Sequence, residues 1–150
     1  MSQSRRNMVR GILLTADDEV LLMKMALPWY PEPVWVTPGG GLHAGESAEE
    51  GLLRELREET GQEQFEIGPQ VWTRTFTIEH AGISVRADER YFLIRCLKFE
   101  PRTEALEDLE RSWLQAFRWW PVFELRSTSD LTSPRNLAEL VSRHAENPPS

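Results

Sequence analysis

The sequence has very little cysteine, with Cys96 as the one thiol in 150 residues. A lone cysteine excludes an internal disulfide framework and a thiol cluster for zinc. Its place inside an apolar run predicts a buried strand residue. Long hydrophobic runs are also lacking, because the first apolar stretch, residues 11–14, is too short for a signal-peptide core or a membrane span. We therefore expect a soluble cytoplasmic protein with no membrane partner.

An excess of positive charge is absent as well. The chain has 17 Lys and Arg against 24 Asp and Glu, a formal net charge of -7. No sequence-wide basic field is available to hold an extended nucleic acid by releasing its counterions. A small phosphorylated substrate stays compatible with this charge, because divalent cations bound to clustered carboxylates reverse the charge locally.

The length and the 40% apolar content suit one domain over residues 1–150. Its core is expected at about 6–145, followed by a disordered tail at about 146–150. Apolar and polar segments alternate in a way that predicts mixed α and β structure. Strands are expected at 8–15 and 20–25 as a hairpin, at 34–37, at 70–79 and 83–99 around a turn, and at 117–120.

The C-terminal part is expected to contain short helices. A helical turn is predicted at 121–125, and Ser133 followed by Pro134 fits an N-cap with proline at the first helical position. Leu137, Leu140 and Val141 would then face the core. Three prolines within residues 27–33 predict instead an irregular surface loop.

One helix is predicted from 48 to 60. Ser47 can cap the backbone donors while Glu50, three residues on, reaches back in a capping box. Gly61 supplies the stop. Its buried side is expected to carry Leu52, Leu53 and Leu56.

Three carboxylates of this helix, those of Glu55, Glu58 and Glu59, share one face because residues three and four apart are neighbours. Hard divalent ions such as Mg²⁺ prefer such oxygen ligands and combine them with substrate phosphates. The competing interpretation is a merely solvated acidic face. The preceding glycines, Gly39, Gly40 and Gly41, favour a phosphate site, because their missing side chains allow backbone donors to approach an anion closely.

These residues belong to a longer pattern: Gly40, five residues, Glu46, seven residues, and then residues 54–62, which read Arg-Glu-Leu-Arg-Glu-Glu-Thr-Gly-Gln. The pattern resembles the Nudix box, G-x5-E-x7-R-E-U-x-E-E-x-G-U, in which U is aliphatic. Only the final position departs, since it is Gln62. The flanks at 35–38 and 118–125 are also similar to Nudix domains, so the resemblance covers roughly residues 6–145.

The resemblance implies an α/β fold: an α/β/α sandwich with a mixed, partly curled sheet and a catalytic loop-helix-loop. It also implies that Glu55, Glu58, Glu59 and Gly40 serve a bound Mg²⁺ or Mn²⁺ ion. Glu46 is implied to stabilise the loop-helix junction, and Arg54 to orient a neighbouring glutamate. The implied reaction is attack of water on a diphosphate linkage in a nucleoside triphosphate, a nucleotide sugar or a dinucleotide.

Several points stay open at this stage. The general base is a box glutamate or one of four later acids, Glu104, Glu107, Asp108 and Glu110. A non-hydrolytic nucleotide-sensing module is the alternative function, although the intact carboxylate set argues against it. Family members are often homodimers, which leaves a second copy of this chain as a possible partner.

Aromatic residues supply the remaining candidates, since planar groups stack on aromatic faces. Trp29 and Tyr30, in the proline-containing loop, are the candidates for substrate contact. Four other tryptophans are expected to pack in strands: Trp35, Trp72, Trp119 and Trp120. For Glu89 an ion pair at a strand edge is preferred over a place in the substrate cleft.

Overall fold

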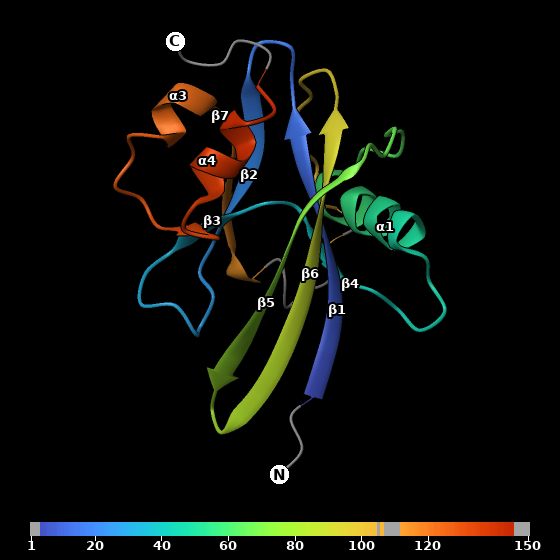
Figure 1. Cartoon of the computed structure of the whole chain (residues 1–150), viewed down its shortest axis with the longest axis vertical. Coiled ribbons are helices and arrows are strands. Elements are labelled where there is room, and N and C mark those ends of the chain that lie inside the picture. The colour runs from blue at the N-terminus through green and yellow to red at the C-terminus, as the bar shows by residue number, and fades with distance from the viewer. Residues whose placement is uncertain (1–3, 105, 107–111, 146–150) are drawn as a thin grey trace.

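The computed structural model describes residues 4–104, 106 and 112–145 (Figure 1). Its helices are α1 (Ala48–Thr60), α3 (Val122–Leu125) and α4 (Leu137–Ser142). Its strands are β1 (Ser4–Leu14), β2 (Glu19–Met25), β3 (Val34–Val36), β4 (Gly39–Gly41), β5 (Gln70–His80), β6 (Ile83–Arg95), β7 (Leu114–Pro121) and β8 (Thr132–Ser133).

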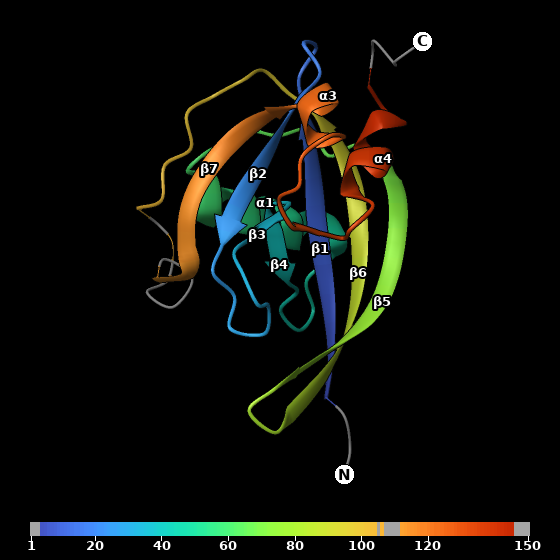
Figure 2. The same cartoon turned by 90° about the vertical axis from the view of Figure 1, so that its left-hand side faces the viewer.

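The strands form one mixed sheet that opens into two halves. The order is β5-β6-β1-β2-β3-β8, with β4 on β1 and β7 on β2. β1 and β2 pair at Leu14 and Val20, close to their connecting turn. β1 then continues beside β4, whereas β2 runs between β3 and β7. The halves diverge from the shared turn, and Figure 2 shows the resulting curl.

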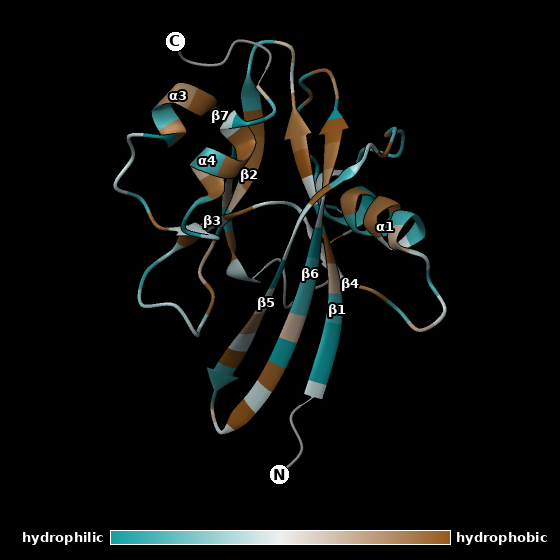
Figure 3. Ribbon diagram, viewed as in Figure 1, coloured by the Kyte–Doolittle hydropathy of each residue, from teal (hydrophilic) through white to brown (hydrophobic). Residues whose placement is uncertain are grey.

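Helices cover both faces of the sheet, which confirms the expected α/β/α sandwich. Figure 1 shows α1 on one side and α3 with α4 on the other. Leu52 and Leu56 of α1 are fully buried against Val9, Leu13 and Ile94. The opposite core joins buried strand residues to Val122, Leu125, Leu137, Leu140 and Val141. In Figure 3 the parts of β1 and β6 nearest their ends at Leu14 and Arg95 are hydrophobic, as these two cores require.

The ends of α1 match the sequence prediction because short-range hydrogen bonds determine them. The Glu50 backbone N–H donates to the Ser47 hydroxyl, and the Ser47 N–H donates to the Glu50 carboxylate, both at 3.1 Å. Gly61 ends the helix with a left-handed φ of 76°. Leu53 is only half-buried, so its predicted place on the buried side is partly wrong.

Other predicted boundaries need correction. β1 begins at Ser4 rather than at residue 8, because its polar first residues pair with β6 from Val85 onward. β6 ends at Arg95 rather than at 99, so Cys96 is a half-buried residue after the strand and its prediction as a buried strand residue is wrong. The glycines at 39–41, which the resemblance placed in the loop-helix-loop, form strand β4. Ser133 is not an N-cap: it lies in β8, paired with Val36, and α4 begins later.

The predicted tail at 146–150 lies outside the described residues. None of the helices in the described part of the chain is long and apolar enough to cross a membrane.

Candidate active site

The glycine strand β4 lies against β1 at very short range. Gly39 pairs with Arg10, and a Cβ on Gly39 would stand 2.1 Å from the Val9 carbonyl oxygen. Its φ of 140° is one that L side chains rarely adopt. The Gly39 N–H donates to the buried Glu59 carboxylate at 2.7 Å. This donor therefore serves the protein itself, in contrast to the expectation that it faces an anionic ligand.

Gly40 leaves room for the Glu55 side chain. A Cβ on Gly40 would lie 2.7 Å from the Glu55 carboxyl carbon and 2.8 Å from both carboxylate oxygens. The carboxylate thus packs directly over the strand backbone. Glycine at this position is what allows α1 and β4 to bring the two groups together.

Arg54 joins the loop and the helix. Its guanidinium contacts both oxygens of Glu46, at 2.7 and 2.9 Å, and the Gly41 carbonyl at 2.9 Å. It also donates to Glu55 at 3.0 Å and to Glu58 at 3.5 Å. The hydrogen bond to a neighbouring glutamate that the resemblance implied is therefore present.

The loop carboxylate is held in its ionised form. The hydrogen bond from Arg54, supported by one from the His43 backbone N–H, lowers the pKa of Glu46 to about 2. Gln62, the position that departs from the Nudix box, is exposed. A polar side chain at an exposed position keeps its contact with water, so glutamine is accommodated there.

Two of the three helix carboxylates are buried. Glu55 is 6% and Glu59 4% exposed, whereas the Glu58 side chain is 28% exposed. Burial raises the pKa of Glu55, and the charge of Glu58 acts in the same direction, although Arg54 opposes both. A buried carboxylate near a second carboxylate favours the approach of a cation.

The donor chemistry of these residues fits a hard divalent ion. Carboxylate and backbone carbonyl oxygens are the ligands that Mg²⁺ and Mn²⁺ accept. Glu55, Glu59 and Gly40 line one cavity, and Glu58 is on the adjacent turn of α1. In the described part of the chain, no three histidine, cysteine, aspartate or glutamate side chains already surround a common point. Glu55 and Glu58 accept hydrogen bonds from Arg54, whereas Glu59 accepts one from the Gly39 N–H.

The main cavity has a volume of about 450 Å³ and lies between the two halves of the sheet. Its catalytic wall consists of β4 with Glu55 and Glu59. Aromatic side chains form another part of the lining: Trp29, Tyr30, Phe76, Tyr91 and Trp113. Aliphatic residues and methionines form most of the remainder, which also includes four charged side chains: Arg6, Arg10, Arg74 and Glu89.

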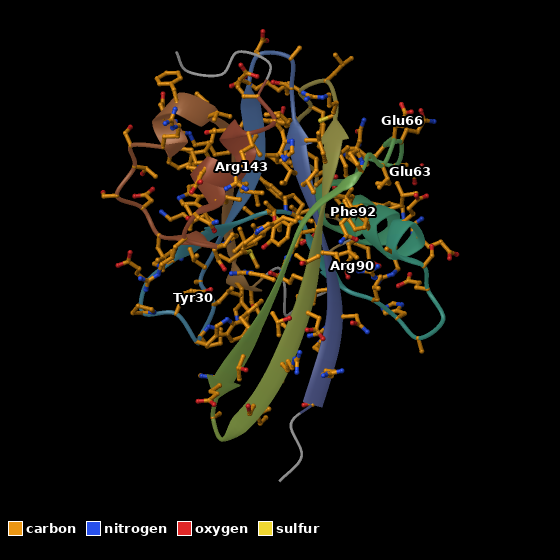
Figure 4. All side chains as sticks on the ribbon, in the orientation of Figure 1. Tyr30, Glu63, Glu66, Arg90, Phe92 and Arg143 are labelled. Carbon is orange, nitrogen blue, oxygen red and sulfur yellow. The ribbon has the colours of Figure 1, made fainter. Side chains whose placement is uncertain are left out.

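The aromatic lining contains both residues expected to contact a substrate. Trp29 stands edge-on to Trp113, with ring centroids 5.6 Å apart. The Tyr30 hydroxyl donates to the Ser133 hydroxyl at 2.8 Å, and Figure 4 shows Tyr30 on the side of the sheet away from α1. Trp113 was missed at the sequence level, because it follows an acidic segment without a strand pattern.

The other tryptophans pack as expected. Trp35 and Trp120 are buried and lie edge to face at 5.3 Å. Trp72 contacts Tyr91, and Trp119 packs against Phe99 while its indole N–H donates to the Phe99 carbonyl.

Glu89 does not form the expected ion pair at a strand edge. Its strand, β6, lies between β5 and β1, and its side chain is 1% exposed on the cavity wall. The carboxylate accepts from Arg10 at 2.7 Å, from Arg74 at 2.6 Å and from the Tyr91 hydroxyl at 3.0 Å. Pairing with β1, far away in the sequence, makes this an interior position.

Of the four later acids considered as the general base, Glu104 lies among the described residues. Glu104 is 70% exposed, pairs with Arg102 and does not line the main cavity. Glu107, Asp108 and Glu110 lie outside the described residues.

The sheet with helices on both faces, and the box helix beside a glycine strand, are the arrangement expected of a hydrolase of the Nudix type. The chain belongs to the NUDIX domain family, whose pattern matches residues 5–141.

Individual relatives agree with this assignment. The chain is 42% identical to the Nudix hydrolase YvcI of Bacillus subtilis over 64 residues, 42% of this chain and 36% of that protein. It is 28% identical to the RNA pyrophosphohydrolase of Cellvibrio japonicus, over 91% of this chain and 86% of that one. The solved structure of a MutT protein from Methanosarcina mazei has the same fold, with a TM-score of 0.70, 19% identity, and 98% and 99% of the two chains covered.

Proposed function

We propose that this chain is a divalent-metal-dependent pyrophosphohydrolase. Its substrate class is a nucleoside diphosphate linked to another moiety: a nucleoside triphosphate, a nucleotide sugar or a dinucleotide. Glu55, Glu58, Glu59 and Gly40 would hold Mg²⁺ or Mn²⁺, and Arg54 positions the glutamates. Gly40, Gly41, Trp29 and Tyr30 would contact the substrate, whereas the N–H of Gly39 is occupied by Glu59.

One observation carries this proposal. A single cavity brings the buried carboxylates of Glu55 and Glu59 together with the aromatic lining around Trp29 and Tyr30. A nucleotide has the matching two ends, an anionic phosphate group and a planar base. The cavity volume of about 450 Å³ also lies within the usual range for small-molecule sites.

The bound cation would neutralise the pyrophosphate and activate or orient the attacking water. The protein supplies the rest of the arrangement. Arg54 fixes the carboxylate of Glu55 and ties the helix to Glu46 and Gly41. The Gly39 N–H keeps Glu59 at the wall of the cavity, so the carboxylates are oriented before substrate arrives.

The test is release of phosphate or nucleoside monophosphate from a panel of nucleoside triphosphates, nucleotide sugars, dinucleoside polyphosphates and dinucleotides, with Mg²⁺ or Mn²⁺. A 5′-triphosphorylated oligonucleotide is included because the Cellvibrio japonicus relative is named for RNA. The variant is Glu59→Gln, and the matched control is Glu49→Gln, the same change at an exposed position of α1.

We expect metal-dependent turnover of at least one compound, reduced by on the order of 10² or more in Glu59→Gln and unchanged in Glu49→Gln. Equal turnover in all three proteins would refute the assigned role of Glu59. Saturable nucleotide binding without turnover across the panel would support the alternative, a non-hydrolytic nucleotide-sensing module.

A further inference from the structure

The wall of the main cavity contains three buried or half-buried charges that the proposed hydrolysis does not use. Glu89 lies between the guanidinium groups of Arg10 and Arg74, whose side chains are 17% and 20% exposed. Such a cluster is costly to desolvate, and apolar residues would stabilise a purely structural wall more simply. Ala87 and Val85, on the same strand and lining the same cavity, show that apolar residues are accommodated there.

Glu89 is unsuited to be a general base. Three donors occupy its carboxylate, and although burial raises its pKa, the charges of Arg10 and Arg74 outweigh that effect and hold the pKa below its usual value. An ionised carboxylate in this state is a poor proton acceptor. Its hydrogen bonds instead point to a role that acts through the residues it holds.

The first branch of hydrogen bonds leads to the catalytic wall. Arg10 donates from Nε to Glu89 and from Nη1 to the carbonyl oxygens of Thr37, at 3.3 Å, and Gly39, at 3.1 Å. The Gly39 N–H in turn donates to Glu59. The position of a proposed metal ligand is thus linked to Glu89 through Arg10 and β4.

The second branch leads to the loop that carries Tyr30. Arg74 donates from Nε to Glu89 and from Nη2 to the Ser133 hydroxyl at 2.8 Å. The same hydroxyl accepts from Tyr30. Residues of β6, β5 and β8 thereby connect to the 27–33 loop, which lines the aromatic part of the cavity.

We propose that Glu89 is a positioning residue that holds the glycine strand through Arg10 and the Tyr30 loop through Arg74, so that both parts of the site share one anchor. The functional consequence rests on the proposed hydrolysis. The holding of the two segments by Glu89 is independent of that hydrolysis, because loss of either branch should change the exchange of backbone amides even without a substrate.

The test compares Glu89→Gln, Arg10→Gln and Arg74→Gln with the control Asp88→Asn. In glutamine one of the two oxygens that accept from Arg10 and Arg74 becomes an NH2 donor, so one guanidinium loses its acceptor. The bond to the other guanidinium is weakened because the negative charge is removed. Asp88 is adjacent on β6 but bonds outward to Thr75 instead of lining the cavity. Hydrogen exchange of the Gly39 and Tyr30 amides is followed by NMR in the free protein, and kcat and KM are measured for a panel substrate.

We expect exchange to accelerate about tenfold at both amides in Glu89→Gln, at Gly39 alone in Arg10→Gln, at Tyr30 alone in Arg74→Gln, and at neither in the control. With a substrate, Arg10→Gln should lower kcat and Arg74→Gln should raise KM, each about tenfold, and Glu89→Gln should do both.

Uniform acceleration across β1, β5 and β6 would overturn the proposal, since it indicates a merely structural role. So would unchanged exchange at both amides. If Glu89→Gln does not fold, the two arginine variants decide the question by whether their effects are separate. If no compound of the panel is turned over, the proposed function fails while the exchange data still test the anchor.

Discussion

Gly40→Ala should disable the site without removing any of its functional groups. The backbone of Gly40 is not in the left-handed region, so alanine is tolerated conformationally. Its Cβ, however, would stand 2.7 Å from the Glu55 carboxyl carbon, against the 3.4 Å at which ordinary contact begins. The carboxylate must therefore move by about 0.7 Å, more than the ~0.5 Å that catalytic constellations tolerate.

The effect should fall on activity more than on stability. A displacement of this size is expected to lower kcat/KM by about 10²-fold and to weaken Mn²⁺ binding. Stability changes in two opposite ways: alanine reduces the entropy of the unfolded chain by roughly 0.4–1 kcal/mol, while a strained Glu55 rotamer costs roughly 0.5–1.5 kcal/mol. The free energy of unfolding should therefore stay within about 1 kcal/mol of the wild type.

The assays are turnover of a panel substrate, Mn²⁺ titration by calorimetry, and urea unfolding. Gly82→Ala is the control, because its Cβ would meet nothing within 4 Å while its φ of 78° still imposes backbone strain. That variant should lose stability and keep its activity. Wild-type kcat/KM and Mn²⁺ affinity in Gly40→Ala would refute the reasoning, since they would show that Glu55 need not occupy its place over β4.

Leu56→Ala should lower the free energy of unfolding by about 2–5 kcal/mol, because this side chain is fully buried between α1 and the sheet. Burial raises the pKa of the Cys96 thiol to about 11, so iodoacetamide should react slowly at pH 8, faster as the pH approaches 11, and faster in urea. The pKa of Glu46 is lowered, so its ionised form stabilises the fold above the unfolded-state pKa, and this stabilisation should be lost as the pH falls toward about 2.

The control for Leu56→Ala is Leu97→Ala, at a residue that is 89% exposed, which should change the free energy of unfolding by less than about 0.5 kcal/mol. Equal losses in the two leucine variants would contradict the core assignment. Fast alkylation of the folded protein at pH 8 would contradict the raised pKa of the half-buried Cys96 thiol. The urea midpoint of Glu46→Gln should depend less on pH between 5 and 2 than that of the wild type, and identical profiles would exclude the contribution of Glu46.

Helix α1 and the carboxylates it carries follow from the amino-acid sequence alone. The cap at Ser47, the stop at Gly61 and the face shared by Glu55, Glu58 and Glu59 depend on residues a few positions apart, so local hydrogen bonding and helix geometry determine them. The box pattern also predicted the contact of Arg54 with a neighbouring glutamate, because both groups lie on the same helix.

The rest of the site depends on contacts between residues that lie far apart in the sequence. Arg10 and Glu89 are 79 positions apart and meet because β1 and β6 pair in parallel along the whole of β1. The alternation of residues within β5 and β6 shows which side chains share a face of the sheet, but it does not show whether that face lines the cavity. Trp113 and Trp29 are also far apart in the sequence and meet in the folded chain. Ser133 reaches the site because its strand, β8, pairs with β3. Long-range strand pairing brings these residues together, and no local pattern in the chain encodes the partner that a strand will find.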